Sequence, residues 1–157
     1  MKTLIICYSR TGMTKKVADA LAKELTADIE DIISETKWAG VIGWLKAGKF
    51  AMQKKLCKIK ELQHNLDDYD LIIIGTPVWA GAISPPVRTF ISNNKNKCKD
   101  VAFFCTQGSS GAEQVLKQMQ DLSDKKPKAT MYINSSTVNS SDKLFSKVKE
   151  FISIIKD

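Results

Sequence analysis

The chain has 157 residues, of which 43% are hydrophobic and 26% charged, a balance typical of globular proteins and unlike that of disordered or fibrous chains. The formal net charge of +7 favours association with acidic partners, but charge alone predicts no specific nucleic-acid binding. No apolar run approaches the ~18 residues of a membrane span, and the first one, residues 4–7, is too short for a signal sequence, so we expect a cytoplasmic protein.

Apolar runs alternate with helical patterns along the chain, which predicts an α/β protein built from β-α-β units around a parallel sheet. The order is a strand at residues 3–8, a helix at 14–25 and a weaker strand at 28–33. Residues 70–75 form the clearest buried strand, and Pro85–Pro86 opens a short helix that ends at Ile91. A strand at 101–106, a helix at 112–122 and a strand at 128–133 follow.

The last helix is predicted to begin near Asp142, with Ser140 or Ser141 as its cap. Its inward-facing residues are expected to be Leu144, Phe145, Val148, Phe151, Ile152 and Ile155. The sequence shows no repeat, low-complexity tract or linker, so we expect a single domain over residues 1–157.

The Trp38–Lys60 segment is the least predictable part of the chain. It combines Trp38, Trp44 and Phe50 with six lysines and no acidic residue. We expect a crossover helix at residues 41–56 whose lysines face solvent. The residues expected to face the sheet are Trp44, Leu45, Ala51, Met52 and Leu56. In the alternative interpretation, the tryptophans or lysines of this segment border a ligand or dock a partner.

A loop of small hydroxyl-bearing residues follows the first strand. It comprises Ser9, Arg10, Thr11, Gly12, Met13 and Thr14. Hydroxyl donors, a flexible glycine and the amides of a helix N-terminus together make a phosphate-binding loop that needs no lysine. An ordinary N-cap turn is the alternative, since serine, threonine and glycine are common there.

The loop after the third strand carries a tryptophan between glycine and proline residues. It comprises Thr76, Pro77, Val78, Trp79, Ala80 and Gly81. The indole offers a flat face for stacking on a planar ring, and Gly81 permits close backbone approach. Alternatively, Trp79 caps the core.

The loop after the fourth strand is small and rich in polar groups. Thr106, Gln107, Gly108 and Ser109 are its candidate ligand-binding residues. Such a loop either binds the polar edge of a heteroaromatic ring or is a plain turn. Because the carboxyl ends of parallel strands share one edge of a sheet, we expect the three loops to lie together at the point where strand order reverses.

These motifs resemble those of the flavodoxin-like family. Residues 8–14, YSRTGMT, are similar to the family's phosphate loop, and residues 75–81, GTPVWAG, are similar to its flavin loop. The resemblance covers nearly the whole chain. It implies a three-layer α-β-α sandwich with a five-stranded parallel sheet of order 2-1-3-4-5 and a bound flavin mononucleotide (FMN). Residues 9–14 would then hold the phosphate, residues 76–81 would flank the isoalloxazine ring, and residues 106–109 would meet its pyrimidine edge.

The chain also departs from the family pattern. Met13 stands where the family often has asparagine, and the third loop lacks the aromatic residue that stacks on the second flavin face in many flavodoxins. That face is therefore open, or it is covered by Trp38 or Trp44. The basic charge is unlike that of typical electron-carrier flavodoxins, which are acidic.

The sequence contains no convincing nucleotide-binding P-loop, metal-binding motif or catalytic group of side chains. Residues 43–49 fit G-x-x-x-x-G-K by letter, but Phe50 stands where a P-loop has its Mg²⁺-binding hydroxyl, and no clear strand precedes it. The four cysteines have no C-x-x-C spacing, and His64 is the only histidine. We therefore expect no metal site and no catalytic side chain. Cys105, just before the third loop, is either a buried strand residue or a thiol close to the flavin.

Three functions remain open on the sequence. The first is an FMN-binding redox protein that carries electrons between partner proteins. The second is an NAD(P)H-dependent FMN oxidoreductase that reduces small planar, quinone-like acceptors, and the third is a flavin-free binding module with the same fold. In either redox protein the flavin carries the chemistry. The sequence leaves the oligomeric state open.

Overall fold

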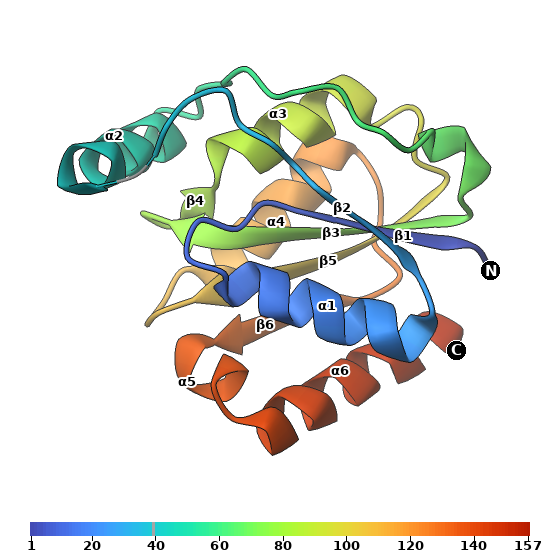
Figure 1. The fold of residues 1–157 in the computed structure, drawn as a ribbon. Coiled ribbons are helices and arrows are strands. Elements are labelled where there is room, and N and C mark those ends of the chain that lie inside the picture. The colour runs from blue at the N-terminus through green and yellow to red at the C-terminus, as the bar shows by residue number, and fades with distance from the viewer. Residues whose placement is uncertain (39) are drawn as a thin grey trace.

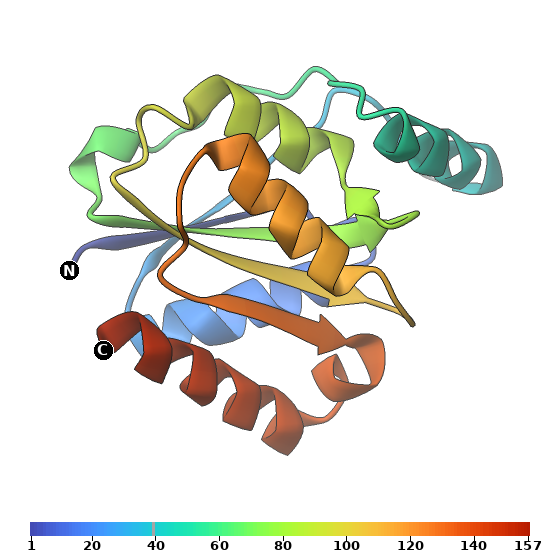
Figure 2. The ribbon, with the colours of Figure 1, turned by 180° about the vertical axis from the view of Figure 1, so that it is seen from behind.

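A computed structural model describes residues 1–38 and 40–157 and shows a parallel sheet with helices on both faces (Figures 1 and 2). The five parallel strands lie in the order β2-β1-β3-β5-β6. They are β1 (Thr3–Cys7), β2 (Asp28–Asp31), β3 (Leu71–Trp79), β5 (Asp100–Gln107) and β6 (Thr130–Asn134). A two-residue strand, β4 (Ala82–Ile83), pairs antiparallel with the end of β3. The expected α/β sandwich and strand order are confirmed, with β5 and β6 as the predicted fourth and fifth strands.

The helices form two layers around this sheet. Helices α1 (Met13–Leu25) and α6 (Ser141–Lys156) cover one face, and α3 (Pro85–Asn94) and α4 (Ala112–Ser123) cover the other (Figure 1). Helix α2 (Gly40–Met52) lies beside the β3–β4 hairpin, at the edge where the strands end. Two short elements complete the chain, the 3-10 helix η1 (Leu66–Asp68) and the helix α5 (Ser135–Val138).

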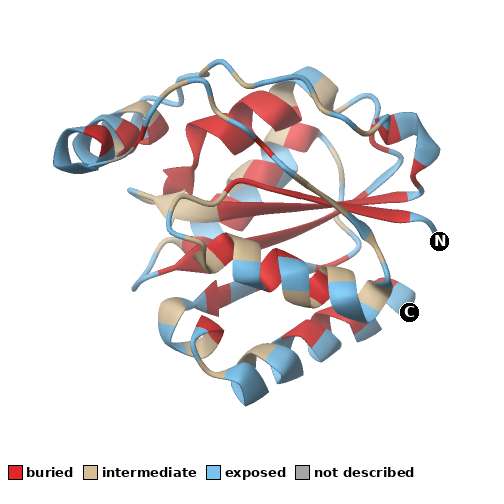
Figure 3. Ribbon diagram, viewed as in Figure 1, coloured by how far each residue is buried: buried red, intermediate tan, exposed pale blue. Residues whose placement is uncertain are grey.

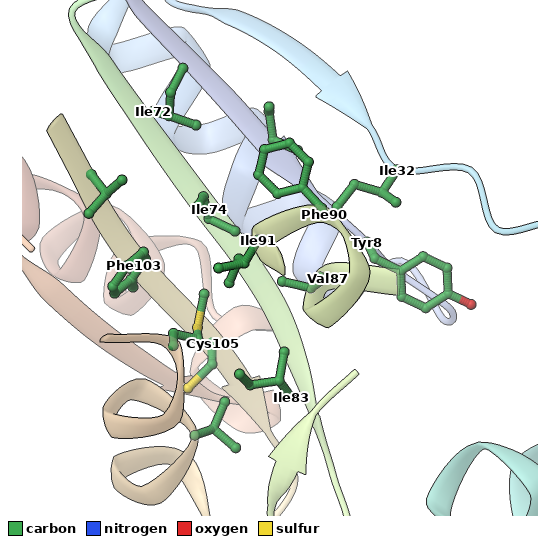
Figure 4. Close-up of a cluster of buried hydrophobic side chains, with 14 of the residues drawn as sticks. Tyr8, Ile32, Ile72, Ile74, Ile83, Val87, Phe90, Ile91, Phe103 and Cys105 are labelled. Atoms are coloured by element: carbon green, nitrogen blue, oxygen red, sulfur yellow. The ribbon is translucent and has the colours of Figure 1, made fainter. Parts of the chain in front are cut away.

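The central strands are apolar on both faces because helices cover both. Leu4 and Ile6 of β1 belong to the cluster under α3 and α4, whereas Ile5 and Cys7 belong to the cluster under α1 and α6. All four side chains are fully buried, which explains the nearly unbroken apolar run. Figure 4 shows part of the first cluster, with Val87, Phe90 and Ile91 of α3 close to side chains of β3 and β5, and Figure 3 shows the buried strands.

One residue of the last helix is placed differently from the expectation. Val148, Phe151, Ile152 and Ile155 are buried and Leu144 is half-buried, but Phe145 is 47% exposed. The fully buried stripe of α6 begins only at Val148, and the Phe145 ring instead lies 4.3 Å from the amine of Lys149.

The prediction of which residues of the second helix face the sheet is largely wrong. Helix α2 ends at Met52, not at residue 56, and only Ala51 of the expected set is buried. The large residues of that set, Trp44, Leu45, Met52 and Leu56, are between 52% and 68% exposed. The small residues Gly43, Ala47 and Ala51 face the core instead, because the backbone comes so close that a Cβ on Gly43 would lie 2.6 Å from the Trp38 carbonyl carbon. Lys46 and Lys49 do face solvent, as expected.

Candidate functional site

The three predicted loops meet at the carboxyl edge of the sheet. The Thr14 and Thr106 hydroxyls lie 2.8 Å apart in a buried hydrogen bond that joins the first and third loops. The second and third loops touch at two glycines, where a Cβ on Gly111 would lie 3.1 Å from the Gly81 Cα. The edge therefore presents one composite surface rather than three separate turns.

The first loop ends in a helix N-terminus with open amide donors. Gly12 is the N-cap of α1 at φ 90°, and among the described residues no side chain caps the helix and no acid lies in its first turn. Ser9 Oγ accepts a hydrogen bond of 3.1 Å from the Gly12 amide, which fixes the loop. Thr11 is exposed, Arg10 and Met13 are half-buried, and the Thr14 hydroxyl is occupied by Thr106. The arrangement suits an anion held by backbone amides.

Trp79 lies at the end of β3 rather than within a loop. Ala80 and Gly81, at φ 50° and 70°, form the two-residue turn that leads into β4. The half-buried Trp79 indole is braced edge-on by Tyr8 and Trp38, with ring centroids 5.5 and 5.8 Å away. Trp79 packs against the core cluster and is only half-buried, so its predicted stacking on a planar ring stays a prediction. The guanidinium carbon of Arg10 lies 5.9 Å from its ring centroid, which puts this aromatic platform beside the first loop.

Two polar residues that no sequence motif predicts, Gln118 and Ser84, hold the hairpin. Gln118 of α4 donates a 3.0 Å hydrogen bond to the Gly81 carbonyl and accepts a 3.2 Å one from Arg88. The Ser84 and Thr76 hydroxyls form a buried hydrogen bond of 2.9 Å. The Thr76 hydroxyl therefore points into the protein. Pro77 and Val78 are half-buried and Ala80 is exposed. No motif marks Gln118 or Ser84, because their roles depend on contacts made only in the fold.

In the third loop, backbone groups are available to a ligand, whereas the Gln107 side chain is bonded within the protein. Gln107 accepts from the Ala112 amide at 2.9 Å and donates to Asn134 at 2.8 Å, so it ties the loop to α4 and β6. Gly108 and Ser109 are exposed. Of the residues expected here, these two are accessible to a ligand, whereas Gln107 and Thr106 are buried.

Two neighbouring cavities border this edge. One of about 660 Å³ lies between α2 and the hairpin, with Trp44, Leu45 and Met52 on one side and Trp79 and Ala80 on the other. The second, of about 490 Å³, is lined by Arg10, Thr11, Gly40, Val41 and Trp44. Both volumes fall within the ~300–1000 Å³ of small-molecule sites.

The Cys105 thiol is not exposed at this surface. Cys105 is fully buried, and burial raises its pKa to about 12, which confirms its interpretation as a strand residue. Over residues 1–38 and 40–157 no three metal-ligating side chains cluster, and no helix is long and apolar enough to cross a membrane.

The sheet order, the uncapped α1 terminus and the Trp79 platform define an α/β protein of the flavodoxin-like class. The family model for flavodoxin matches residues 2–152, and the chain belongs to this family. No curated protein sequence matches the chain.

Solved structures resemble it over nearly their whole length. A flavoprotein from Lactobacillus acidophilus in complex with FMN has 24% identity and a TM-score of 0.74, covering 96% of this chain and 98% of that one. A candidate flavoprotein from Bacteroides eggerthii has 22% identity and a TM-score of 0.80, covering 99% and 98%. Another from Bacteroides uniformis has 25% identity and a TM-score of 0.78, covering 97% of each chain.

Proposed function

We propose that this protein binds one FMN non-covalently and uses it to transfer electrons. The observation that carries the proposal is the uncapped N-terminus of α1 next to an aromatic platform. The Trp79 indole packs edge-on against Tyr8, and its ring centroid lies 5.9 Å from the guanidinium carbon of Arg10 in the first loop. An anion site next to an aromatic platform matches a ligand that joins a phosphate to a planar ring. The similar Lactobacillus acidophilus flavoprotein was solved with FMN, which supports the same cofactor here.

The residues present fit this cofactor. The first-turn amides of α1 and the exposed Thr11 hydroxyl would hold the phosphate, and Trp79 would pack on the ring. The exposed backbone at Gly108 and Ser109 would meet its polar edge. When bound, FMN supplies the electron-accepting ring, and the protein binds it, orients it and sets its electrostatic surroundings.

We assign no acid or base catalyst to the protein. An electron carrier serving a redox partner protein is the first candidate. The second is an oxidoreductase that takes electrons from a reduced nicotinamide to a small planar, quinone-like acceptor, and the net charge of +7, unlike the acidic charge of typical electron-carrier flavodoxins, favours it. The four free cysteines fit a reducing compartment, which supports a cytoplasmic location.

The basic surface bears on the reduction potential. Reduced flavin is anionic at neutral pH, and a net charge of +7 disfavours that form less than an acidic protein would. We therefore expect a higher reduction potential for this flavin than in an acidic flavodoxin. Salt should diminish the difference, because charges are screened over ~8 Å.

Titration of the apoprotein with FMN and with riboflavin, which lacks the phosphate, tests the proposed function. Several charge-assisted hydrogen bonds to the phosphate should make FMN bind at least about 100-fold more tightly. Thr11→Val should weaken FMN binding alone, whereas Trp79→Ala should weaken both ligands by the same factor. Equal affinities of the wild type for FMN and riboflavin would contradict the phosphate site.

A further inference from the structure

Helix α2 presents a row of large apolar residues that the protein itself leaves uncovered. Val41, Trp44, Leu45 and Met52 are each 59–77% exposed, and their spacing places them along one side of the helix. Isolated exposed apolar residues are ordinary, but a row of four beside a cavity indicates a surface that a ligand covers.

The position of this row is fixed by the small residues next to it. Gly43, Ala47 and Ala51 are buried, and a Cβ on Gly48 would lie 4.0 Å from the Ala80 Cβ. The helix therefore packs closely on Trp38 and on the hairpin, and its apolar row borders the space in front of Trp79.

Trp44 is the aromatic residue that connects the two halves of the candidate site. It lines the cavity of about 490 Å³ together with Arg10 and Thr11, and it lines the cavity of about 660 Å³ together with Trp79. A ligand with its phosphate at the first loop and its ring at Trp79 would pass directly beside the Trp44 indole.

Trp38 is not available for the same role. It is 3% exposed, its Nε1 donates a 3.1 Å hydrogen bond to Ser34 Oγ, and its ring packs edge-on against Trp79 and Phe50. Trp38 supports the platform from behind. Residues 107–111 of the third loop contain no aromatic side chain either.

We propose that Trp44 of α2 is the second aromatic wall of the FMN site and covers the flavin face that the third loop leaves open. This inference rests on the proposed function. It assigns to the α2 segment, rather than to the loop after β5, the contact with the second face of the ring. An indole placed there would lose exposed area to the ligand and gain stacking geometry with it.

The test compares the affinities of FMN and riboflavin for four apoproteins: the wild type, Trp44→Ala, Trp44→Phe and Ile42→Ala. Ile42 is the matched control because it lies on α2, is 83% exposed and lines neither cavity. Trp44→Ala should weaken both ligands by the same factor, about 10-fold, and Trp44→Phe should stay within about 3-fold of the wild type. Ile42→Ala should match the wild type. Denaturant unfolding of each apoprotein checks that the substitutions at these exposed positions leave the fold intact.

The outcomes separate this inference from the proposed function. If Trp44→Ala binds both ligands as tightly as Ile42→Ala does, the proposed contact of Trp44 with the ring is refuted, while the proposal of FMN binding is unaffected. Weakened binding of FMN alone would place Trp44 at the phosphate and would also refute the wall. A wild type that binds neither ligand would overturn the proposed function and this inference together.

Discussion

Replacing Thr14 with valine removes one hydroxyl of the buried pair that joins the first and third loops. Thr14 is 1% exposed and Thr106 is 5% exposed, and their Oγ1 atoms are 2.8 Å apart. Valine has nearly the same shape, so Thr14→Val leaves no large cavity and changes mainly the hydrogen bonding. The Thr106 hydroxyl then stays buried without its partner.

The expected cost follows from that orphaned group. Leaving one buried hydroxyl unpaired costs about 1–3 kcal/mol, whereas replacing both partners with apolar groups of the same shape is nearly neutral. Each single variant, Thr14→Val and Thr106→Val, should therefore lose about 2 kcal/mol of unfolding free energy. The double variant should lose no more than either single variant, which gives a coupling energy of at least about 2 kcal/mol.

Denaturant unfolding of the FMN-free proteins, followed by far-ultraviolet circular dichroism, measures all four free energies. The protein must be free of FMN because a ligand bound to the native state adds its own stabilisation. Additive losses, with a coupling energy below about 0.3 kcal/mol, would refute the view that this hydrogen bond joins the two loops.

Three further predictions concern the same edge of the sheet. Gly111→Ala should destabilise the protein by about 1–3 kcal/mol, because φ is +99° and the new Cβ would lie 3.1 Å from the Gly81 Cα; an unchanged denaturation midpoint would contradict this. Arg10→Ala should weaken FMN binding at low ionic strength and approach the wild type at high salt, whereas a deficit that stays constant with salt would exclude a screened charge effect. Burial raises the Cys105 pKa to about 12, so the group stays a protonated thiol at pH 8. Alkylation of Cys105 in the folded protein should accordingly be undetectable at pH 8 by mass spectrometry and should rise with pH, and prompt labelling at pH 8 would show that the thiol is accessible.

The strands were predictable because burial on both faces leaves a direct mark in the sequence. The run from Leu71 to Ile74 is apolar at every position, as a central parallel strand requires. The extension of β3 to Trp79 was not predictable, since Pro77 suggests the end of a strand. The turn that follows has Ala80 in the left-handed region, where glycine or asparagine is the usual signal.

The orientation of α2 shows where hydrophobic patterning misleads. Large apolar residues at helical spacing normally face the core, yet in α2 they face an open cavity while Gly43, Ala47 and Ala51 are buried. The sequence did hold a signal for the correct orientation, because these three small residues recur at every fourth position. Small residues along one side of a helix permit close approach of its backbone to a neighbour. The supporting contacts of Gln107 and Gln118 left no such signal, because they join residues far apart in the chain.

The most direct test of the central claim is the visible absorption spectrum of the purified protein after incubation with excess FMN and removal of the unbound ligand. The proposed site predicts retained flavin absorbance at close to one FMN per chain, and loss of that absorbance in Trp79→Ala under the same treatment. A wild-type protein that comes through colourless would contradict FMN binding and would leave a binding module that shares only the flavodoxin fold.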